Sequence, residues 1–388
     1  MSRLSFRVIT KALPAVFLLL AVSCAPTARI ATSQLDTPQH HTFTGMKLLG
    51  HEKYTDAKRE FELALQLDAK YSQAHSALAL VQIHEENRDA ALESLNKGWK
   101  FARTKEDRLL VHVNRIRVYT QSKDEKNRLA PAQSEFEAAI KLDANHAPAY
   151  YFMGLAYKVA CDFNAAGEMF SKVLALKTDY TAEADVQWHF IQKVARAMPA
   201  SATGKQIALV ERLTRGDAAA LLMEELKIDV LYKKRTPGTF DTSFKDPQQA
   251  AQEAVVEKPT AKDIGDHPLK ADIEGILEVG VRGLEKYPDG NFHPADRVTR
   301  AAYAMMLEDI LIKVTGDNAL ATRFIGSKSP FPDMRADLPY FNAVMVVTSR
   351  GIMEARDMTT GEFAPLGSVA GVDALLIIRK FKEELKFD

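Results

Sequence analysis

The chain has few cysteines and no excess of charge of either sign. Its 388 residues include two cysteines, Cys24 and Cys161, and Lys plus Arg equal Asp plus Glu at 51 each. A single cysteine after residue 24 excludes an internal disulfide in that part and any site built from several thiolates. A neutral chain lacks the basic surface that a phosphate backbone requires, so we expect no nucleic-acid partner.

The sequence also lacks the short motifs of common enzyme classes. It contains no nucleophile elbow, phosphate loop, HExxH pair or dinucleotide fingerprint, and Thr203-Gly204-Lys205 lacks the glycine that would begin a phosphate loop. The histidines are scattered, and none lies four residues from a second histidine. We therefore expect no catalytic residue, no metal site and no cofactor.

After the first 23 residues no segment is long and apolar enough to cross a bilayer. Within them, Arg3, Arg7 and Lys11 precede an apolar run over 12–22, which is the pattern of a secretory signal peptide. Residues 21–24, Ala-Val-Ser-Cys, resemble the lipobox of bacterial lipoproteins. The resemblance implies cleavage before Cys24, whose thiol then receives a diacylglycerol. The alternatives are an ordinary cleaved signal or an uncleaved anchor.

The residues after Cys24 bear on where the chain is held. Residues 24–37 are small and polar, and we interpret them as a tether between the membrane and the folded part. Alanine follows the cysteine at residue 25, which does not resemble an inner-membrane retention signal. The lipoprotein resemblance therefore implies a cell-envelope location, lipid-anchored in the outer membrane and facing the periplasm.

The first half of the chain repeats one amphipathic pattern. The segments 54–68 and 163–176 both place a small residue three after an aromatic and another aromatic four later; 131–143 is a third copy and 91–98 a weaker one. Each follows another amphipathic helix that has a small residue where helices must touch, at Gly45, Ala79 and Gly154. The pattern resembles the tetratricopeptide repeat, whose period is about 34 residues. This resemblance implies helical hairpins that stack into a solenoid.

We place the solenoid at 38–198, with repeats at 38–71, 72–105, 106–146 and 147–180 and a capping helix at 182–198. The third repeat carries roughly seven extra residues in its first helix or in the loop before it. First helices line the concave face of such a solenoid. The repeat register assigns to this face Gln73, Ser76, Leu80, Asn114, Arg117, Gln121, Tyr151 and Lys158. We expect a groove for an unidentified protein partner; the alternative is a solvated face that serves only as a spacer.

The second half contains a distinctive loop and helix start. Tyr-Pro-Asp-Gly at 287–290 predicts a turn, because proline presets its first position and glycine supplies positive φ, and Val-Thr-Arg-Ala follows at 298–301. Together they resemble an S-layer homology domain. A second copy begins at Phe331-Pro332-Asp333, and 213–222 resembles the helix start alone. The resemblance implies helix–loop–helix units around a pseudo-threefold axis that bind peptidoglycan or a secondary cell-wall polymer.

We therefore expect a partial repeat at 199–232, a linker at 233–262, and repeats at 263–328 and 329–388. A wall polymer that carries carboxylates needs a fixed cation and helix-start amides. The resemblance assigns this binding to Arg215, Asp217, Asp289, Gly290, Thr299 and Arg300. Helix capping is the competing explanation, since Thr214 and Thr299 are natural N-caps and Asp217 completes a capping box.

The sequence thus predicts an all-α, non-enzymatic envelope lipoprotein. In this interpretation a tetratricopeptide-like solenoid binds a protein partner, and a degenerate S-layer-like module contacts the wall. The alternative is a protein-assembly scaffold in which the C-terminal module only packs or binds a partner.

Overall fold

The computed structural model describes residues 29–122, 128–235 and 260–386. Within these ranges the regular structure is helical, and extended segments pair only at two isolated bridges, Thr214 with Arg297 and Thr299 with Ser368. The predicted all-α class is confirmed. The predicted signal peptide at 1–23, the predicted lipidation site Cys24 and most of the predicted linker at 233–262 lie outside the described residues.

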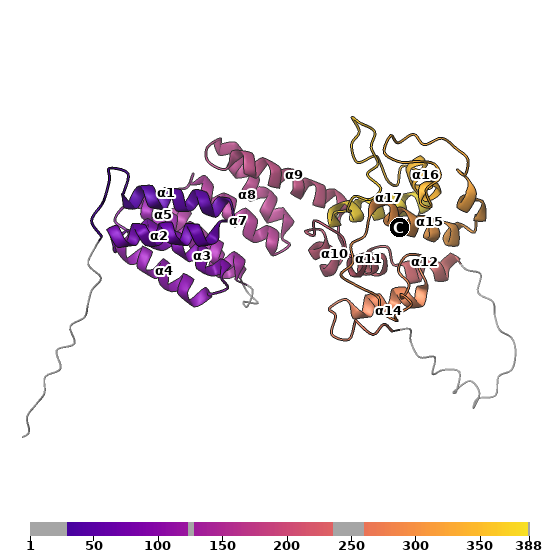
Figure 1. Ribbon diagram of the computed structural model, residues 1–388, viewed down its shortest axis with the longest axis horizontal. Helices are drawn as coiled ribbons and strands as arrows, with labels where there is room; N and C mark the ends of the chain where they lie inside the picture. Colours follow the sequence, from indigo (N-terminus) through magenta and orange to yellow (C-terminus); the bar gives the residue numbers. More distant parts are fainter. Residues whose placement is uncertain (1–28, 123–127, 236–259, 387–388) are drawn as a thin grey trace, which may run out of the picture. The chain divides into compact units, whose positions relative to one another are not determined.

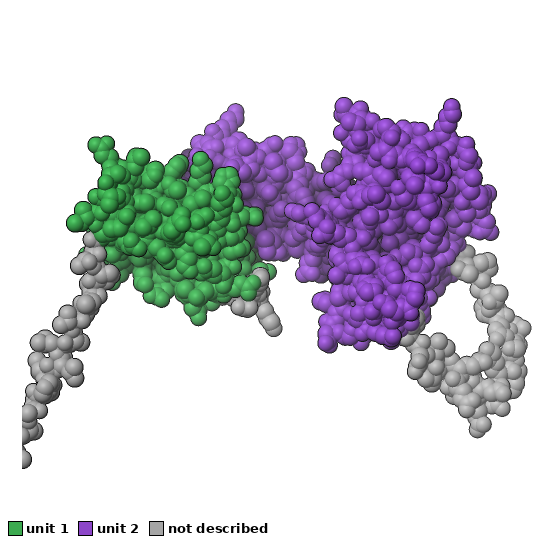
Figure 2. All heavy atoms as spheres, viewed as in Figure 1, with its two compact units in different colours: residues 1–143 green, residues 144–388 purple. Residues whose placement is uncertain are grey.

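The chain divides into two compact units, 1–143 and 144–388 (Figure 2). In the described part of unit 1 the helices pack in sequential pairs, α1 with α2, α3 with α4 and α5 with α6 (Figure 1). Their bounds are α1 Pro38–Gly50, α2 Tyr54–Leu67, α3 Ser72–His84, α4 Arg88–Phe101, α5 Lys105–Gln121 and α6 Leu129–Leu142.

Glycine allows the helices of a pair to approach closely. A Cβ added at Gly45 of α1 would lie 2.4 Å from Cε1 of Phe61 on α2, and Phe61 is fully buried. In unit 2, a Cβ at Gly154 would lie 2.6 Å from Cε1 of Phe170, which is also fully buried. The aromatic ring thus fills the space that the missing side chain leaves, which is why the sequence pairs these residue types at both positions.

The third helix pair carries extra length in its first helix, one of the two predicted places. The loop before α5 is only 102–104, whereas α5 has 17 residues against 13 in α3. Further residues, 122–128, lie between α5 and α6. Thr104 and Asp107 form a reciprocal capping box that fixes the start of α5. The expected extra residues therefore lie in the first helix and after it, and not in the preceding loop.

Residues 29–37 pack on the first helix pair, so the predicted tether at 24–37 is wrong over this stretch. The backbone amide of Arg29 donates to the carbonyl oxygen of Gln66 at the end of α2 (2.8 Å), and the Arg29 side chain pairs with Asp36. Asp36 is buried, and its carboxylate also contacts Nε2 of His41 on α1 (2.9 Å). A carboxylate buried among these partners holds the segment against the helices.

Unit 2 begins with a further helix pair and a long helix, α7 Ala147–Val159, α8 Phe163–Leu176 and α9 Thr181–Ala197. Residues 199–235 and 260–386 follow, and we call them the C-terminal module. Its helices are α10 Ala202–Ile207, α11 Arg215–Ala220, the π-helix η1 Leu221–Glu225, α12 Ile228–Arg235, α14 Lys270–Val279, α15 Arg300–Thr315, the 3-10 helix η2 Asn318–Thr322, α16 Phe341–Ser349 and α17 Gly371–Leu385.

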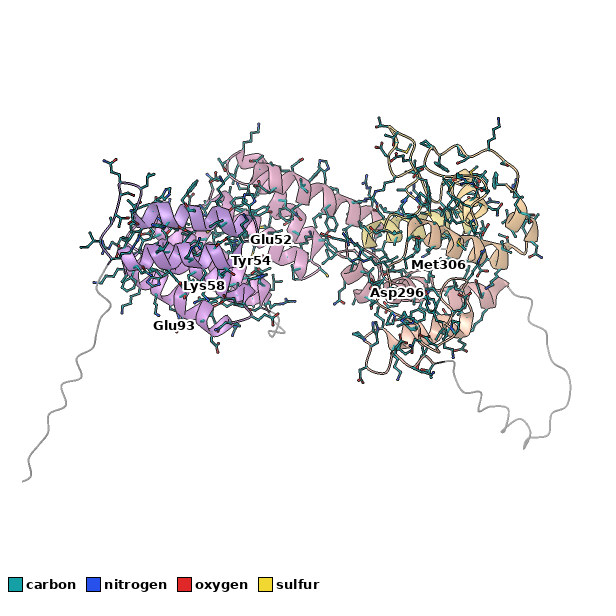
Figure 3. All side chains as sticks on the ribbon, in the orientation of Figure 1. Glu52, Tyr54, Lys58, Glu93, Asp296 and Met306 are labelled. Carbon is teal, nitrogen blue, oxygen red and sulfur yellow. The ribbon has the colours of Figure 1, made fainter. Side chains whose placement is uncertain are left out.

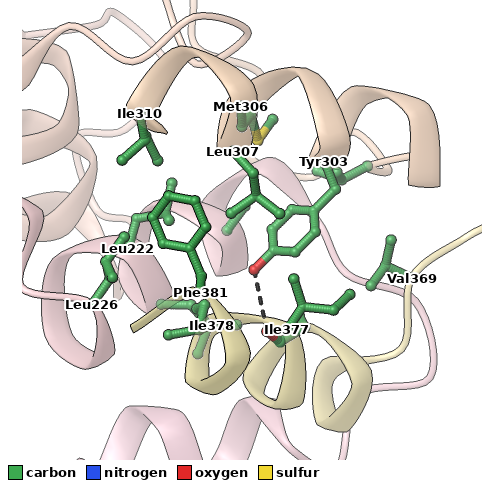
Figure 4. Close-up of a cluster of buried hydrophobic side chains, with 14 of the residues drawn as sticks. Leu222, Leu226, Tyr303, Met306, Leu307, Ile310, Val369, Ile377, Ile378 and Phe381 are labelled. Carbon is green, nitrogen blue, oxygen red and sulfur yellow. Dashed lines mark hydrogen bonds between the residues drawn. The ribbon is translucent and has the colours of Figure 1, made fainter. Parts of the chain in front are cut away.

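The C-terminal module has one continuous apolar core. Side chains from η1, α15 and α17 meet in it, among them Leu222, Tyr303 and Phe381 (Figure 4). Tyr303 is fully buried, and its hydroxyl donates to the carbonyl oxygen of Ala374 on α17 (3.3 Å). Burial raises the pKa of Tyr303 far above its usual range, so the hydroxyl stays a donor at physiological pH. Segments far apart in sequence therefore share one core.

Candidate functional site

The Pro-Asp-Gly segment forms the predicted turn. The amide of Gly290 donates to the carbonyl oxygen of Tyr287 (2.9 Å), and the amide of Tyr287 donates to the carbonyl oxygen of Asn291 (2.9 Å). Gly290 has φ +86°, a conformation that glycine adopts at little cost, and a Cβ there would lie 2.9 Å from Cε of Lys262. The turn therefore accounts for Gly290 without a ligand.

Asp289 lies at the exposed tip of this turn, where we predicted a polymer contact. Its carboxylate accepts from the amide of Asn291 (2.8 Å) and lies 3.0 Å from Nε2 of His293. The hydrogen bond from the Asn291 backbone, with further help from His293, lowers the pKa of Asp289. The group is thus ionised at neutral pH, and about half of its side chain is exposed.

An aspartate that sequence reasoning did not assign to the site holds the loop from behind. The carboxylate of Asp263 accepts from the amides of Phe292 (2.8 Å) and His293 (2.7 Å). In the repeat at 329–388, Asp333 accepts from the amides of Phe363 (3.0 Å) and Ala364 (2.7 Å). The usable signal was an aspartate 29 or 30 residues before the loop phenylalanine in both copies.

The two loops correspond residue by residue over 280–300 and 351–371 without a gap. Glycines with positive φ recur at the same places, Gly280 with Gly351 and Gly290 with Gly361. His293 and Ala364 both adopt left-handed conformations, with φ of 54° and 55°. The loop of the repeat at 329–388 therefore has the same backbone as the loop of the repeat at 263–328, although it lacks the Pro-Asp dipeptide.

The two motif arginines brace these loops from inside and are only 8% exposed. Arg215 donates through Nε to the carbonyl oxygen of Phe292 (2.9 Å) and through Nη2 to that of Glu285 (2.8 Å). Arg300 donates in the same way to the carbonyl oxygens of Phe363 (2.7 Å) and Glu354 (2.6 Å). We predicted that both would bind polymer directly. That role stays a prediction: in the structure backbone carbonyls take these donors, and little of either side chain is exposed.

The third helix start, in the third copy at 329–388, has Gly371 where the other two have arginine. In the other copies the amides of Arg215 and Arg300 donate to the carbonyl oxygens of Asp296 and Gly367. At the corresponding position, the amide of Gly371 donates to the carbonyl oxygen of Val210 (2.8 Å) in the first copy, the partial repeat at 199–232. Each helix start therefore contacts the loop of the next copy, and the third contacts the first. A closed order of this kind is what the predicted pseudo-threefold arrangement would produce.

The other predicted polymer ligands at helix starts serve as caps. Oδ2 of Asp217 accepts from the amide of Thr214 (3.0 Å) and from its hydroxyl (2.8 Å), which completes a capping box. The hydroxyl of Thr299 accepts from the amide of Ala302 (3.1 Å). Capping accounts for Asp217 and Thr299, so the competing explanation in the sequence holds for both.

An open cleft of about 520 Å³ lies between the loop at 283–298 and the first turns of α15. We call it the loop cleft; Figure 3 labels Asp296 and Met306 on its walls. It is lined by Arg215, Gly283, Glu285, Lys286, Tyr287, Pro288, Asp296, Arg297, Val298, Ala302 and Met306. Its accessible walls combine two cations, two anions and one aromatic ring. Of the predicted polymer ligands, only Arg215 lines it.

Tyr287 is the aromatic wall of the loop cleft, and sequence reasoning missed it as a site residue. The guanidinium carbon of Arg215 lies 4.8 Å from the centre of its ring, and the side chain of Tyr287 remains 43% exposed. The buried arginine thus supports one face of the ring while the residue stays accessible. Arg297 and Lys286 were also missed, because they lie beside the motif positions and not at them.

The predicted groove residues of unit 1 are partly buried. Ser76 and Asn114 have no exposed surface, and Nδ2 of Asn114 donates to Oγ of Ser76 (3.0 Å), which joins α3 to α5. They cannot contact a partner, so the prediction is wrong for both, and Leu80 is also buried. Gln73 donates to Asp107 (3.1 Å) and is half-buried. Arg117 is half-buried and Gln121 is exposed.

The two predicted groove residues of unit 2 lie against neighbouring helices. Tyr151 is 9% exposed and stacks on Tyr180, with ring centres 4.7 Å apart. Nζ of Lys158 donates to Gln187 (2.8 Å) and lies 4.3 Å from the ring centre of Phe190. Burial lowers the pKa of Lys158. Packing of α7 against α9 and the connection before it thus occupies both side chains.

Cys161 is a half-buried single thiol, and burial raises its pKa. Among the described residues, no three His, Cys, Asp or Glu side chains gather to hold a metal ion. In the same ranges no helix combines the length and apolar character needed to cross a bilayer.

Comparison with known proteins identifies one segment. Residues 284–304 match the family model of the S-layer homology domain. No curated protein matches the chain. The matched residues form most of the loop cleft and the start of α15. Domains of this family typically bind cell-wall polymers, which associates the chain with the cell surface or envelope.

Proposed function

We propose that this protein is a non-enzymatic lipoprotein of the bacterial cell envelope. In this proposal its C-terminal module binds cell-wall polysaccharide or peptidoglycan, and its tetratricopeptide-like helix pairs hold a partner protein. The observation that carries the wall-binding part is the loop cleft, because most of its lining lies in the segment that matches the S-layer homology domain.

The chemistry of the loop cleft suits a charged glycan. The ring of Tyr287 and the neighbouring Pro288 offer flat apolar surfaces against which a sugar ring can pack. Lys286 and Arg297 supply cations for a carboxylate or ketal acid, and the carboxylate of Asp296 can accept from sugar hydroxyls. In our proposal these exposed side chains bind the polymer, while Arg215 and Arg300 hold the loops in place.

Membrane attachment is proposed from the sequence. Lipidation of Cys24 would anchor the chain by acyl chains, in the outer membrane and facing the periplasm. Gln121 and the half-buried Arg117 and Gln73 remain as candidates for partner binding on unit 1. The proposed partner is a protein that no feature of the structure identifies.

Binding of the purified chain to isolated peptidoglycan sacculi, with and without attached polymer, tests the wall-binding proposal. We expect saturable binding that weakens at least tenfold in the double variant Tyr287→Ala, Arg297→Ala, since residues in the centre of a site dominate affinity. The matched control is Met358→Ala with Arg356→Ala, an apolar and an arginine side chain in the corresponding loop of the repeat at 329–388. Unchanged thermal unfolding must accompany both variants. Absence of binding by the parent chain, or equal loss in both double variants, would refute the proposal.

The third copy favours a second function, in which the module serves as a packing domain. Its acidic motif position, Asp373, forms an ion pair with Lys193 of α9 (2.5 Å between Oδ1 and Nζ). Nη1 of Arg379 also donates to the carbonyl oxygen of Arg196 at the end of α9. The first contact uses the acidic motif position of this copy, and both contacts join α9 to the module. The scaffold function predicts a co-purifying partner protein together with no wall binding by any form of the chain.

A further inference from the structure

One end of unit 1 receives the incoming chain. The amide of Arg29 donates to the carbonyl oxygen of Gln66 in the last turn of α2. The first described residues, indigo in Figure 1, reach the helices there. Oγ of Ser72, at the start of α3, donates to the carbonyl oxygen of Gly98 near the end of α4 (2.7 Å). Gln73 bonds to Asp107 at the start of α5. The connections α2–α3 and α4–α5 therefore lie together at this end, which we call the entry end.

Exposed cations gather at the entry end. They are Lys70, Lys100, Arg103, Lys105 and Arg108. The acidic side chains there are Asp36, Asp68, Glu106, Asp107 and Asp143. Asp36 pairs with Arg29, Asp107 is engaged in the capping box, and Asp143 pairs with Lys105 (3.5 Å). At the opposite end, the connections α1–α2 and α3–α4 and the turns beside them carry the acids Glu52, Asp56, Glu85, Glu86 and Asp89, against the cations Lys47, Lys53, Lys58 and Arg88. Acids are thus in slight excess at this end, and cations at the entry end.

A tryptophan lies next to one of these cations, Arg108. Trp99 lies in the last turn of α4 and is 41% exposed. The guanidinium carbons of Arg115 and Arg108 lie 5.6 Å and 6.0 Å from its ring centre, and the ring of His112 meets it edge-on at 5.0 Å. An exposed indole held between arginines combines an apolar body with a polar edge. That combination suits the headgroup level of a bilayer.

The length of chain before Arg29 limits how far the entry end can stand from an anchor at Cys24. Arg29 lies five positions after Cys24, and an extended chain spans at most about 18 Å over that length. If Cys24 carries acyl chains in the bilayer, as the proposed function holds, the entry end must lie close to the headgroups. Cations near an anionic leaflet are attracted to it within about one Debye length.

We propose that the entry end of unit 1 rests on an anionic bilayer surface, with Trp99 at headgroup level. The geometric step rests on the proposed lipidation, whereas the charge and the exposed indole do not. The contact positions unit 1 on the membrane and adds to the hold that the lipid anchor provides.

The test uses the chain from residue 24 with Cys24→Ser, so that no lipid contributes, and with Trp188→Phe, which leaves Trp99 as the only indole. The probes are vesicles of phosphatidylcholine with 30% phosphatidylglycerol and vesicles of phosphatidylcholine alone. We expect co-sedimentation with the anionic vesicles only, a blue shift of Trp99 emission on binding, and loss of binding as salt rises. Lys100→Glu with Arg103→Glu should weaken binding at least tenfold. The matched reversal at the opposite end, Lys47→Glu with Lys53→Glu, should not.

Failure to bind anionic vesicles, equal binding to neutral ones, or an unshifted Trp99 spectrum on bound protein would overturn the inference. So would equal weakening by the two charge reversals in chains with unchanged thermal unfolding. Lipidation is measured separately, as the added mass of acyl chains on protein recovered from envelopes, and wall binding is measured on sacculi. If the vesicle test fails while protein from envelopes carries acyl chains, the membrane contact of the entry end is refuted and the proposed function is not affected.

Discussion

The backbone of Ile207 occupies the place where a side chain on Gly371 would begin: an ideal Cβ on Gly371 would lie 1.7 Å from the carbonyl oxygen of Ile207. Residue 371 is the position that holds an arginine in the other two copies. The first copy lacks a Pro-Asp-Gly loop. Its short chain instead passes directly against the start of α17, and no room remains for an arginine there.

Replacement of Gly371 by alanine should therefore unfold or strongly destabilise the C-terminal module. Because the clash involves backbone and no flexible side chain, we expect a loss of about 3 kcal/mol or more in the free energy of unfolding. Urea denaturation of the full chain, followed by a signal from the module, measures it. Gly265→Ala is the control, since a Cβ at that exposed position would meet nothing within 4 Å.

Arg300→Ala should lower the stability of the C-terminal module by about 2–4 kcal/mol, because it leaves the buried carbonyl group of Phe363 and the part-buried one of Glu354 without their donors. Arg300→Lys should restore little, since a single ammonium cannot reach both acceptors as the planar guanidinium does. Calorimetry of both variants checks this, with Arg335→Ala, an exposed position, as reference. If Arg300→Ala abolished wall binding at unchanged stability, the bracing role that we assign to this arginine would be incorrect.

Unit 1 should lose stability as the pH rises above neutrality. Nδ1 of His41 lies 2.7 Å from Glu60 and Nε2 lies 2.9 Å from Asp36, so both nitrogens face carboxylates. Burial alone would lower the pKa of His41, but the hydrogen bonds to Glu60 and Asp36 outweigh it and raise the pKa above its usual 6.5. The contribution of protonated His41 to the free energy of unfolding is therefore complete below pH 6.5 and is lost as the pH rises through the raised pKa.

A neutral imidazole can donate only one of the two hydrogen bonds, so the loss should be about 1.5–3 kcal/mol. Thermal unfolding of unit 1 followed from pH 6 to pH 9 measures it. His41→Gln should flatten that dependence. An equally steep decline in the glutamine variant would assign the effect to another group. Asp36, whose pKa the hydrogen bond from the Thr32 backbone lowers, acts in the opposite direction and only at acidic pH.

Gly45→Ala should destabilise the first helix pair by about 1–3 kcal/mol, since the added methyl group would lie 2.4 Å from a buried carbon of Phe61. Gly50 lies at the end of the same helix, and a Cβ there would meet nothing within 4 Å. Gly50→Ala should therefore leave stability unchanged or raise it by up to about 1 kcal/mol. Comparison of the two midpoints in urea isolates the packing effect from helix propensity.

The sequence predicted the helix pairs well, because glycine and aromatic residues recur where helices touch. The small residues expected at these contacts, Gly45 and Gly154, both face a buried phenylalanine. The Pro-Asp-Gly turn was predicted equally well, since the positive φ of Gly290 restricts the residue types that fit. Local geometry of this kind is written in short segments, and so a single sequence suffices to predict it.

The candidate site was predicted less well, because it depends on contacts between distant segments. The motif fixed the positions of Arg215 and Arg300 but not their direction, and both point inward to carbonyl groups of the next loop. Tyr287 becomes a site residue only through the arginine that stacks on it. Asn114 is polar and lies at a predicted groove position, yet its partner Ser76 draws it into the contact between α3 and α5.

The cyclic bracing of the loops means that no single repeat of the C-terminal module is an independent part. Each helix start is completed by the loop of another copy, and the short first copy receives α17, which lies more than a hundred residues later in the chain. A truncation before residue 371 would leave the first copy without its neighbour, and deletion of the first copy would expose the start of the last. The module should therefore be inherited, lost and transplanted whole, and attempts to graft one S-layer-like repeat of this chain onto another protein should carry all three.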